Sequence, residues 1–173
     1  MNSLLVLVIL LSPLVSSGAN FQKEIDKSFP EHVLLKKGEF SSDCTQKDPG
    51  LIAGDFDGDK RSDFAAIIRA KEKKRYEAGV NSYHYYDGKL VVCYSQKKSG
   101  YKCSSISNSM VTIPENSCLE VIKPGEAGCI QDDGTKKSKD IKFDSVGLIF
   151  PERAASQYIR QPDGSFQNCV IGD

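Results

Sequence analysis

The side chains with the most specific chemical spacing lie in the stretch AGDFDGDKRSDFAAII, between residues 55 and 63. Counted from the first aspartate, carboxylates fall at positions one, three, five and nine, and the residue at position seven would offer its backbone carbonyl. Calcium prefers six to eight oxygen ligands, and alternate residues of a curled loop can supply them. The spacing therefore predicts a calcium site with five ligand residues: Asp55, Asp57, Asp59, Arg61 and Asp63.

An acidic turn is the other interpretation, because aspartate side chains commonly accept hydrogen bonds from the backbone of the turn they occupy. Carboxylates about 4 Å apart repel one another by on the order of 1 kcal/mol or more, and a bound divalent cation removes this repulsion. An EF-hand is not expected, since Ala66 stands where the bidentate glutamate would be and FAAIIRA has the composition of a strand. We therefore expect calcium in a structural role.

The segment GDFDGDKRSDFAAII resembles the calcium loop of FG-GAP and VCBS-type β repeats, in which D-x-[DN]-G-D-x-x-x-D precedes an apolar strand. The chain also resembles small exported bacterial proteins of unknown function that carry one such loop and close with a segment similar to LIFPERAASQYIRQPDGSFQNCVIGD. One residue departs from the resemblance. Lys60 stands where these loops usually have glycine, at a position where a left-handed backbone is costly for a residue with a Cβ atom.

The sequence predicts no catalytic residues. Neither G-x-S-x-G nor H-E-x-x-H occurs, and the two histidines, His32 and His84, lie in no catalytic motif. A hydrolase that uses dispersed carboxylates is the least favoured alternative, because folding can assemble such pairs without a local signature. Several tyrosines could form an aromatic face for a glycan or a protein, although cross-strand packing is the favoured explanation; these are Tyr83, Tyr85, Tyr86, Tyr94 and Tyr101.

A short helix and a series of strands must position these residues. Asn20 could cap a helix whose apolar residues recur every fourth position until Pro30 ends it. Asp87-Gly88 and Pro162-Asp163-Gly164 each lie between strand-like runs and predict two hairpins. EHVLLKKGEF, FAAIIRA, YKCSSI and DIKFDSVGLIF are also expected to form strands. RAKEKKRYE is expected to be a solvated turn or a hairpin tip, and TKKSKD a loop. The prediction is a mainly β fold, with α+β as an alternative: a compact antiparallel domain with a short N-terminal helix.

The apolar stretch MNSLLVLVILLSPLVSS is typical of a secretory signal and too short to span a hydrocarbon core of ~30 Å. We expect residues 1–19 to be a signal peptide, with cleavage after Ala19 or, alternatively, after Ser17. Residues 20–173 then form one domain with no stable membrane span. Basic and acidic residues balance at 23 each, so nothing favours binding to nucleic acid.

The six cysteines fit three disulfides in an oxidising compartment. We expect Cys93 to pair with Cys103 across a hairpin and Cys118 with Cys129, which leaves Cys44 with Cys169. These features predict a secreted or periplasmic, non-enzymatic domain that binds calcium structurally. The alternative is an exported inhibitor or a module that binds a protein or a glycan.

Overall fold

The computed structural model describes residues 18–40, 42–78, 81–107, 117–130, 136–150 and 155–171. The predicted signal peptide lies outside these ranges except for its last two residues, which begin helix α1 (Gly18–Ser28). The helix therefore starts before Asn20, so the predicted cap residue lies inside it. Pro30 follows the end of the helix, as predicted.

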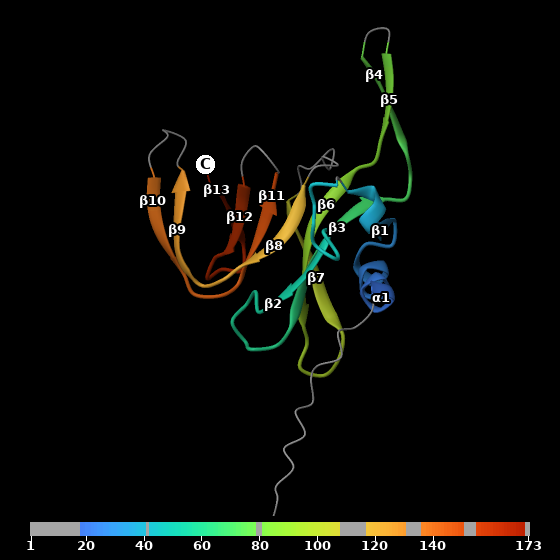
Figure 1. The fold of residues 1–173 in the computed structure, drawn as a ribbon. Helices are drawn as coiled ribbons and strands as arrows, with labels where there is room; N and C mark the ends of the chain where they lie inside the picture. Colours follow the sequence, from blue (N-terminus) through green and yellow to red (C-terminus); the bar gives the residue numbers. More distant parts are fainter. Residues whose placement is uncertain are drawn as a thin grey trace, which may run out of the picture.

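Two antiparallel sheets form the body of the domain, and a two-stranded hairpin projects beyond it (Figure 1). The first sheet contains β1 (His32–Leu34), β2 (Leu51–Gly54), β3 (Asp63–Ala70), β6 (Gly88–Ser95) and β7 (Tyr101–Ser107). The second contains β8 (Cys118–Ile122), β9 (Gly125–Ile130), β10 (Lys136–Ile141), β11 (Ser145–Ile149), β12 (Ala155–Arg160) and β13 (Phe166–Ile171). The projecting hairpin is β4 (Lys74–Ala78) and β5 (Asn81–Tyr85). The predicted antiparallel β-rich domain with an N-terminal helix is confirmed.

Strand β3 is the centre of the first sheet and is buried on both faces. Its neighbours are β1 and β2 on one side and β6 on the other. Phe64, Ala66 and Ile68 pack toward the helix, where they meet Ile25. A strand that is covered on both faces reads as a continuous apolar run rather than an alternating one, which explains the sequence FAAII.

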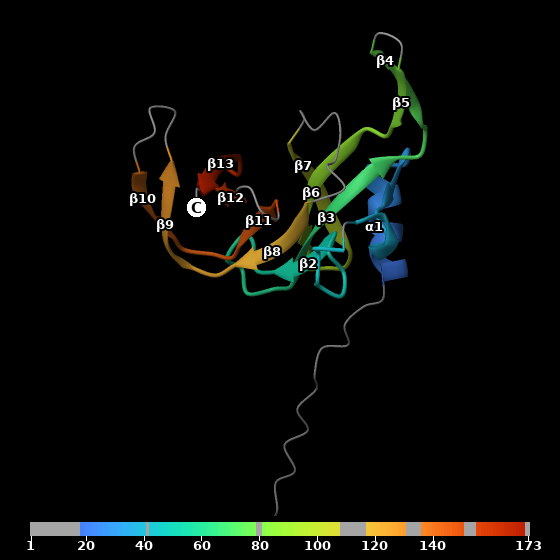
Figure 2. The same ribbon diagram turned by 45° about the horizontal axis from the view of Figure 1, so that its top comes forward.

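The other face of β3 meets the second sheet. Ala65 and Ile67 belong to a cluster that also contains Leu119, Val146 and Leu148 from β8 and β11. The helix, the first sheet and the second sheet are thus three successive layers (Figures 1 and 2). The largest buried cluster lies between the two sheets.

The hairpin predicted at Asp87-Gly88 does not form. Strand β5 pairs with β4 instead of β6, with Tyr76 opposite Tyr83, and β6 pairs with β3 and β7. The apolar strand β6 is buried between two partners of the first sheet, and this burial outweighs the local turn signal. The hairpin predicted at Pro162-Asp163-Gly164 does form, between β12 and β13.

Two further predictions about local structure are wrong. The segment EHVLLKKGEF forms only the three-residue strand β1 and then a short 3₁₀ helix, Lys37–Glu39. Residues 136–140 of the predicted loop TKKSKD belong to β10, an edge strand of the second sheet. Lysine on an edge strand discourages pairing with other chains, so a polar sequence is compatible with a strand at this place.

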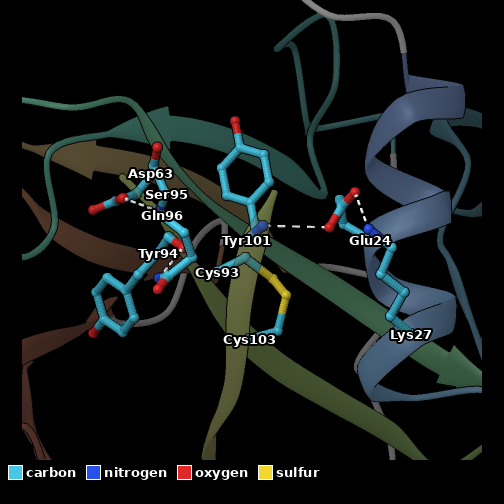
Figure 3. The surroundings of a disulfide bond; sticks show 9 residues. All are labelled: Glu24, Lys27, Asp63, Cys93, Tyr94, Ser95, Gln96, Tyr101 and Cys103. Carbon is cyan, nitrogen blue, oxygen red and sulfur yellow. Dashed lines mark hydrogen bonds and ion pairs between the residues drawn. A yellow bond between two sulfur atoms is a disulfide. The ribbon is translucent and has the colours of Figure 1, made fainter. Parts of the chain in front are cut away.

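Three disulfides cross-link the domain, and two of them join strands. Cys93 and Cys103 lie directly opposite each other in β6 and β7, which confirms the predicted pair (Figure 3). The other two predicted pairs are wrong, because Cys44 bonds to Cys118 and Cys129 bonds to Cys169. Strands β9 and β13, which carry Cys129 and Cys169, are neighbours in the second sheet, a relation that spacing along the chain does not reveal. Three disulfides indicate an oxidising environment, extracellular or periplasmic.

Candidate metal centre

The acidic loop connects β2 to β3. Gly54 and Asp63 are opposite each other at the ends of these strands, so residues 55–62 close the connection. The carboxylates of Asp55, Asp57 and Asp63 each offer an oxygen atom, and the three oxygens lie within 4.8 Å of one another. Oxygen ligands at 2.3–2.6 Å from one calcium ion lie at most about 5 Å apart. These three residues of the predicted ligand set therefore lie close enough together to hold one metal ion.

Asp63 is the buried member of this cluster, with 1% of its surface exposed. Its Oδ1 accepts a hydrogen bond from the backbone N–H of Ser95 at 2.8 Å, and its Oδ2 accepts one from Phe56 at 3.0 Å. Burial, together with the negative charges of Asp57 and Asp59, raises the pKa of Asp63 to about 6 although both hydrogen bonds favour the charged form. A cation beside Asp63 would offset this electrostatic cost.

Asp55 and Asp57 shape the loop through hydrogen bonds from its own backbone. Asp55 accepts from the N–H groups of Gly58 at 2.8 Å and Lys60 at 3.1 Å, and Asp57 accepts from Asp59 at 3.1 Å. These bonds are the turn capping expected of aspartates. They leave room for a cation, because a carboxylate has about four lone-pair positions.

The structure does not bring Asp59 into this cluster. Its carboxylate forms an ion pair with the guanidinium of Arg61 and accepts a hydrogen bond from the Arg61 N–H at 2.9 Å. The Arg61 side chain also donates to the carbonyl oxygen of Ser95 at 2.8 Å, at the end of β6. The predicted ligand roles of the Asp59 carboxylate and the Arg61 carbonyl remain predictions.

Two residues of the loop have a left-handed backbone. Gly58 has φ +80°, and a Cβ atom at this position would lie 2.1 Å from the ring of Phe143. Lys60 has φ 66°, the conformation that glycine adopts without strain. The loop therefore requires glycine at position 58 and tolerates strain at position 60.

The second sheet also holds the loop, through a contact that sequence reasoning missed. The backbone N–H of Asp55 donates to Oδ2 of Asp144 at 3.0 Å, and the N–H of Asp144 donates to the carbonyl oxygen of Asp55 at 3.2 Å. Lys123 donates to the same Asp144 carboxylate at 3.0 Å. Asp144 lies 89 residues from Asp55 along the chain, and no local pattern marks it.

The histidines and tyrosines do not assemble a second site among the described residues. His32 is half-buried beside Phe29, burial lowers its pKa, and its Nδ1 has no described hydrogen-bond partner. Tyr94 packs on the face of the first sheet that meets the second sheet, whereas Tyr101 packs on the opposite face, toward the helix. These two tyrosines therefore do not share one aromatic face. The side chains of Tyr83 and His84 lie outside the described part of the structure.

No protein-family model, curated protein or solved structure matches this chain. In the part of the chain that the structure describes, no helix is long and apolar enough to cross a membrane.

Proposed function

We propose that this chain is a secreted or periplasmic, non-enzymatic domain in which calcium binds structurally to the Asp55–Asp63 loop. The observation that carries the proposal is the approach of three carboxylates to within 4.8 Å of one another, with Asp63 buried at the base of the loop. Charged groups that are buried beside like charges need a compensating partner. A divalent cation supplies it here.

The structural role follows from the position of the loop between the two sheets. Asp63 fixes the end of β6 through the N–H of Ser95, and Asp55 fixes the Asp144 turn of the second sheet. An ion held by Asp55 and Asp63 would therefore join backbone segments of both sheets. Its removal would loosen the layer contact as well as the loop.

Calcium is favoured over magnesium by the chemistry of the ligands. A flexible ring of carboxylates with a carbonyl suits calcium, whereas magnesium demands a tight octahedron and keeps several of its waters. The resemblance of the loop to FG-GAP and VCBS-type repeats supports the same choice. The disulfides and the apolar N-terminal stretch support export.

Thermal unfolding of the oxidised protein in calcium, in magnesium and in chelator tests the proposal. Calcium at 100 times its Kd should stabilise the native state by about 2.7 kcal/mol, and magnesium by less. Asp55→Ala should abolish the difference between calcium and chelator, because it removes one carboxylate of the cluster.

Asp48→Ala is the matched control. Asp48 is exposed and lies at the other end of β2, outside the carboxylate cluster. This variant should keep the full calcium effect. Equal melting temperatures in chelator and in calcium up to millimolar concentration would reject the metal site and leave the loop as an acidic turn.

A further inference from the structure

A pocket of about 580 Å³ lies beside the acidic loop. Its walls come from Asp57 of the loop, from residues 139–145, which run from the end of β10 to the start of β11, and from residues 159–162 at the end of β12. The volume falls in the range of small-molecule sites, which are about 300–1,000 Å³. Apolar side chains supply much of the lining: Ile141, Phe143, Ile159 and Pro162.

Three cationic residues line this pocket, and none of them forms an ion pair in the described structure, although the charge of Arg160 helps to lower the pKa of the exposed Asp163. Lys139 donates to the neutral amide oxygens of Gln161 at 3.0 Å and Gln167 at 2.6 Å. Arg160 lies over the ring of Tyr94 at 5.3 Å, and its Nε has no described hydrogen-bond partner. Lys142 is exposed and has no described partner. The positive charges of Lys139 and Lys142 can therefore act on a ligand, and that of Arg160 is shared with Asp163.

The three acidic residues that line the pocket differ from one another in how their charge is neutralised. The carboxylate of Asp144 is already paired with Lys123, which lies outside the lining. Asp57 belongs both to the pocket wall and to the carboxylate cluster. A calcium ion in the cluster would neutralise Asp57 and leave Asp140 as the one unpaired carboxylate among the described lining residues. The charge of the pocket is thus coupled to the occupancy of the loop.

We infer that this pocket binds a small organic anion with an apolar body, and that calcium in the neighbouring loop strengthens the binding. The anionic group would lie among the three cationic side chains and the apolar body against the isoleucines of β10 and β12. The calcium dependence rests on the function proposed above. The anion site itself rests on the pocket and its cations.

Benzenesulfonate and its neutral analogue benzenesulfonamide are matched probes for this site. Each is titrated into the ¹⁵N-labelled, oxidised protein in calcium, and amide chemical shifts report binding. Benzenesulfonate should give saturable shifts confined to residues 139–145, 159–162 and the acidic loop, and benzenesulfonamide should bind at least about threefold more weakly. Equal binding of the two probes, or shifts centred elsewhere, would overturn the anion site.

Charge variants then separate the contributions. Lys142→Gln should weaken benzenesulfonate by about threefold and leave benzenesulfonamide unchanged, and because Lys142 is exposed this change should not disturb folding. Lys97→Gln, an exposed change outside the lining, should alter neither affinity. An unchanged affinity of Lys142→Gln for benzenesulfonate would contradict the role of the cations.

Asp57→Asn distinguishes the pocket from the metal site. In chelator, wild-type protein should bind benzenesulfonate about threefold more weakly than in calcium. Asp57→Asn should restore this affinity in chelator, because the substitution removes the negative charge of Asp57 that calcium would otherwise neutralise. If calcium stabilises the protein but benzenesulfonate does not bind, the pocket is wrong and the metal site stands. If calcium has no effect but Asp57→Asn still strengthens binding, the anion site stands and its control by calcium is wrong.

Discussion

Two turns of this protein join antiparallel strands with aspartate and glycine, yet their aspartates have opposite electrostatics. The turn between β12 and β13 is self-contained, because Asp163 accepts hydrogen bonds from the N–H of Ser165 at 2.9 Å and from its hydroxyl at 2.6 Å. These bonds lower the pKa of Asp163, which is exposed. In the loop between β2 and β3, burial and neighbouring carboxylates raise the pKa of Asp63 to about 6.

The difference lies in what surrounds each turn. The Asp163 side chain is exposed to solvent, so water and its two hydrogen bonds stabilise the charged carboxylate. The acidic loop is held from outside by Ser95 of the first sheet and Asp144 of the second. Contacts far along the chain thus hold its carboxylates together in a partly buried place. The Asp163 turn stabilises its carboxylate with its own hydrogen bonds, whereas the carboxylate of Asp63 would be stabilised further by the cation proposed above.

The largest expected effect is the difference in the free energy of unfolding between variants of Asp63 and of Asp163. In calcium, Asp63→Ala should lower the free energy of unfolding by about 4 kcal/mol, because two buried N–H groups lose their acceptor and the ion loses a ligand. Asp163→Ala should cost far less, because its side chain and its partners are exposed. Urea unfolding measures both. Losses of similar size would show that the two turns do not differ in the way described.

The second effect is a loss of stability with rising pH, which the raised pKa of Asp63 predicts for the acidic loop and the lowered pKa of Asp163 does not predict for the other turn. Because the pKa of Asp63 rises from 3.8 to about 6 on folding, the native state binds a proton more tightly than the unfolded chain. In chelator this contribution to stability is complete below pH 3.8 and is lost as the pH rises through about 6. The loss is at most about 3 kcal/mol.

Calcium should remove this dependence, because the cation favours the ionised carboxylate. Urea unfolding between pH 4 and pH 7.5, in chelator and in calcium, measures the contribution of the ion. Asp163→Asn should leave the difference between the two titrations unchanged, since its carboxylate lies outside the cluster. Parallel curves in chelator and calcium would contradict a cation beside Asp63.

The features that the sequence predicted are those encoded in consecutive residues. The strand after the acidic loop, the hairpin at Pro162-Asp163-Gly164 and the pairing of Cys93 with Cys103 each follow from a short pattern. The left-handed backbone expected at Lys60 is also present. Each of these depends on local backbone geometry or on two adjacent strands.

The features that the sequence did not predict depend on which distant strands become neighbours. The partners of Cys44 and Cys129 follow from the packing and order of strands in the two sheets, and the contact of Asp55 with Asp144 joins the sheets. The hairpin predicted at Asp87-Gly88 also fails for this reason, because β6 is buried between β3 and β7 and does not pair with β5. A local sequence pattern can favour a turn, but the pairing of strands in the sheet determines whether the turn forms.

The smallest expected effect compares the backbones of the two turns. Lys60 has φ 66° and Gly164 has φ +87°, so each occupies a conformation that favours glycine. Lys60→Gly should stabilise the native state by up to about 1 kcal/mol, because relief of strain is partly offset by the greater freedom of glycine in the unfolded chain. The hydrogen bond from the backbone N–H of residue 60 to Asp55 is retained.

Gly164→Ala should have the opposite sign and cost about 1 kcal/mol, because it introduces the strain that Lys60 already carries. A Cβ atom at this position would lie 3.7 Å from the Arg160 side chain, an ordinary contact, so the cost would report the backbone and not a clash. Urea unfolding in calcium measures both variants. If Lys60→Gly is less stable than the wild type, the contacts of the lysine side chain stabilise the native state by more than the strain of its backbone destabilises it. Lysine in place of the glycine of the resembling loops would then increase the stability of this protein.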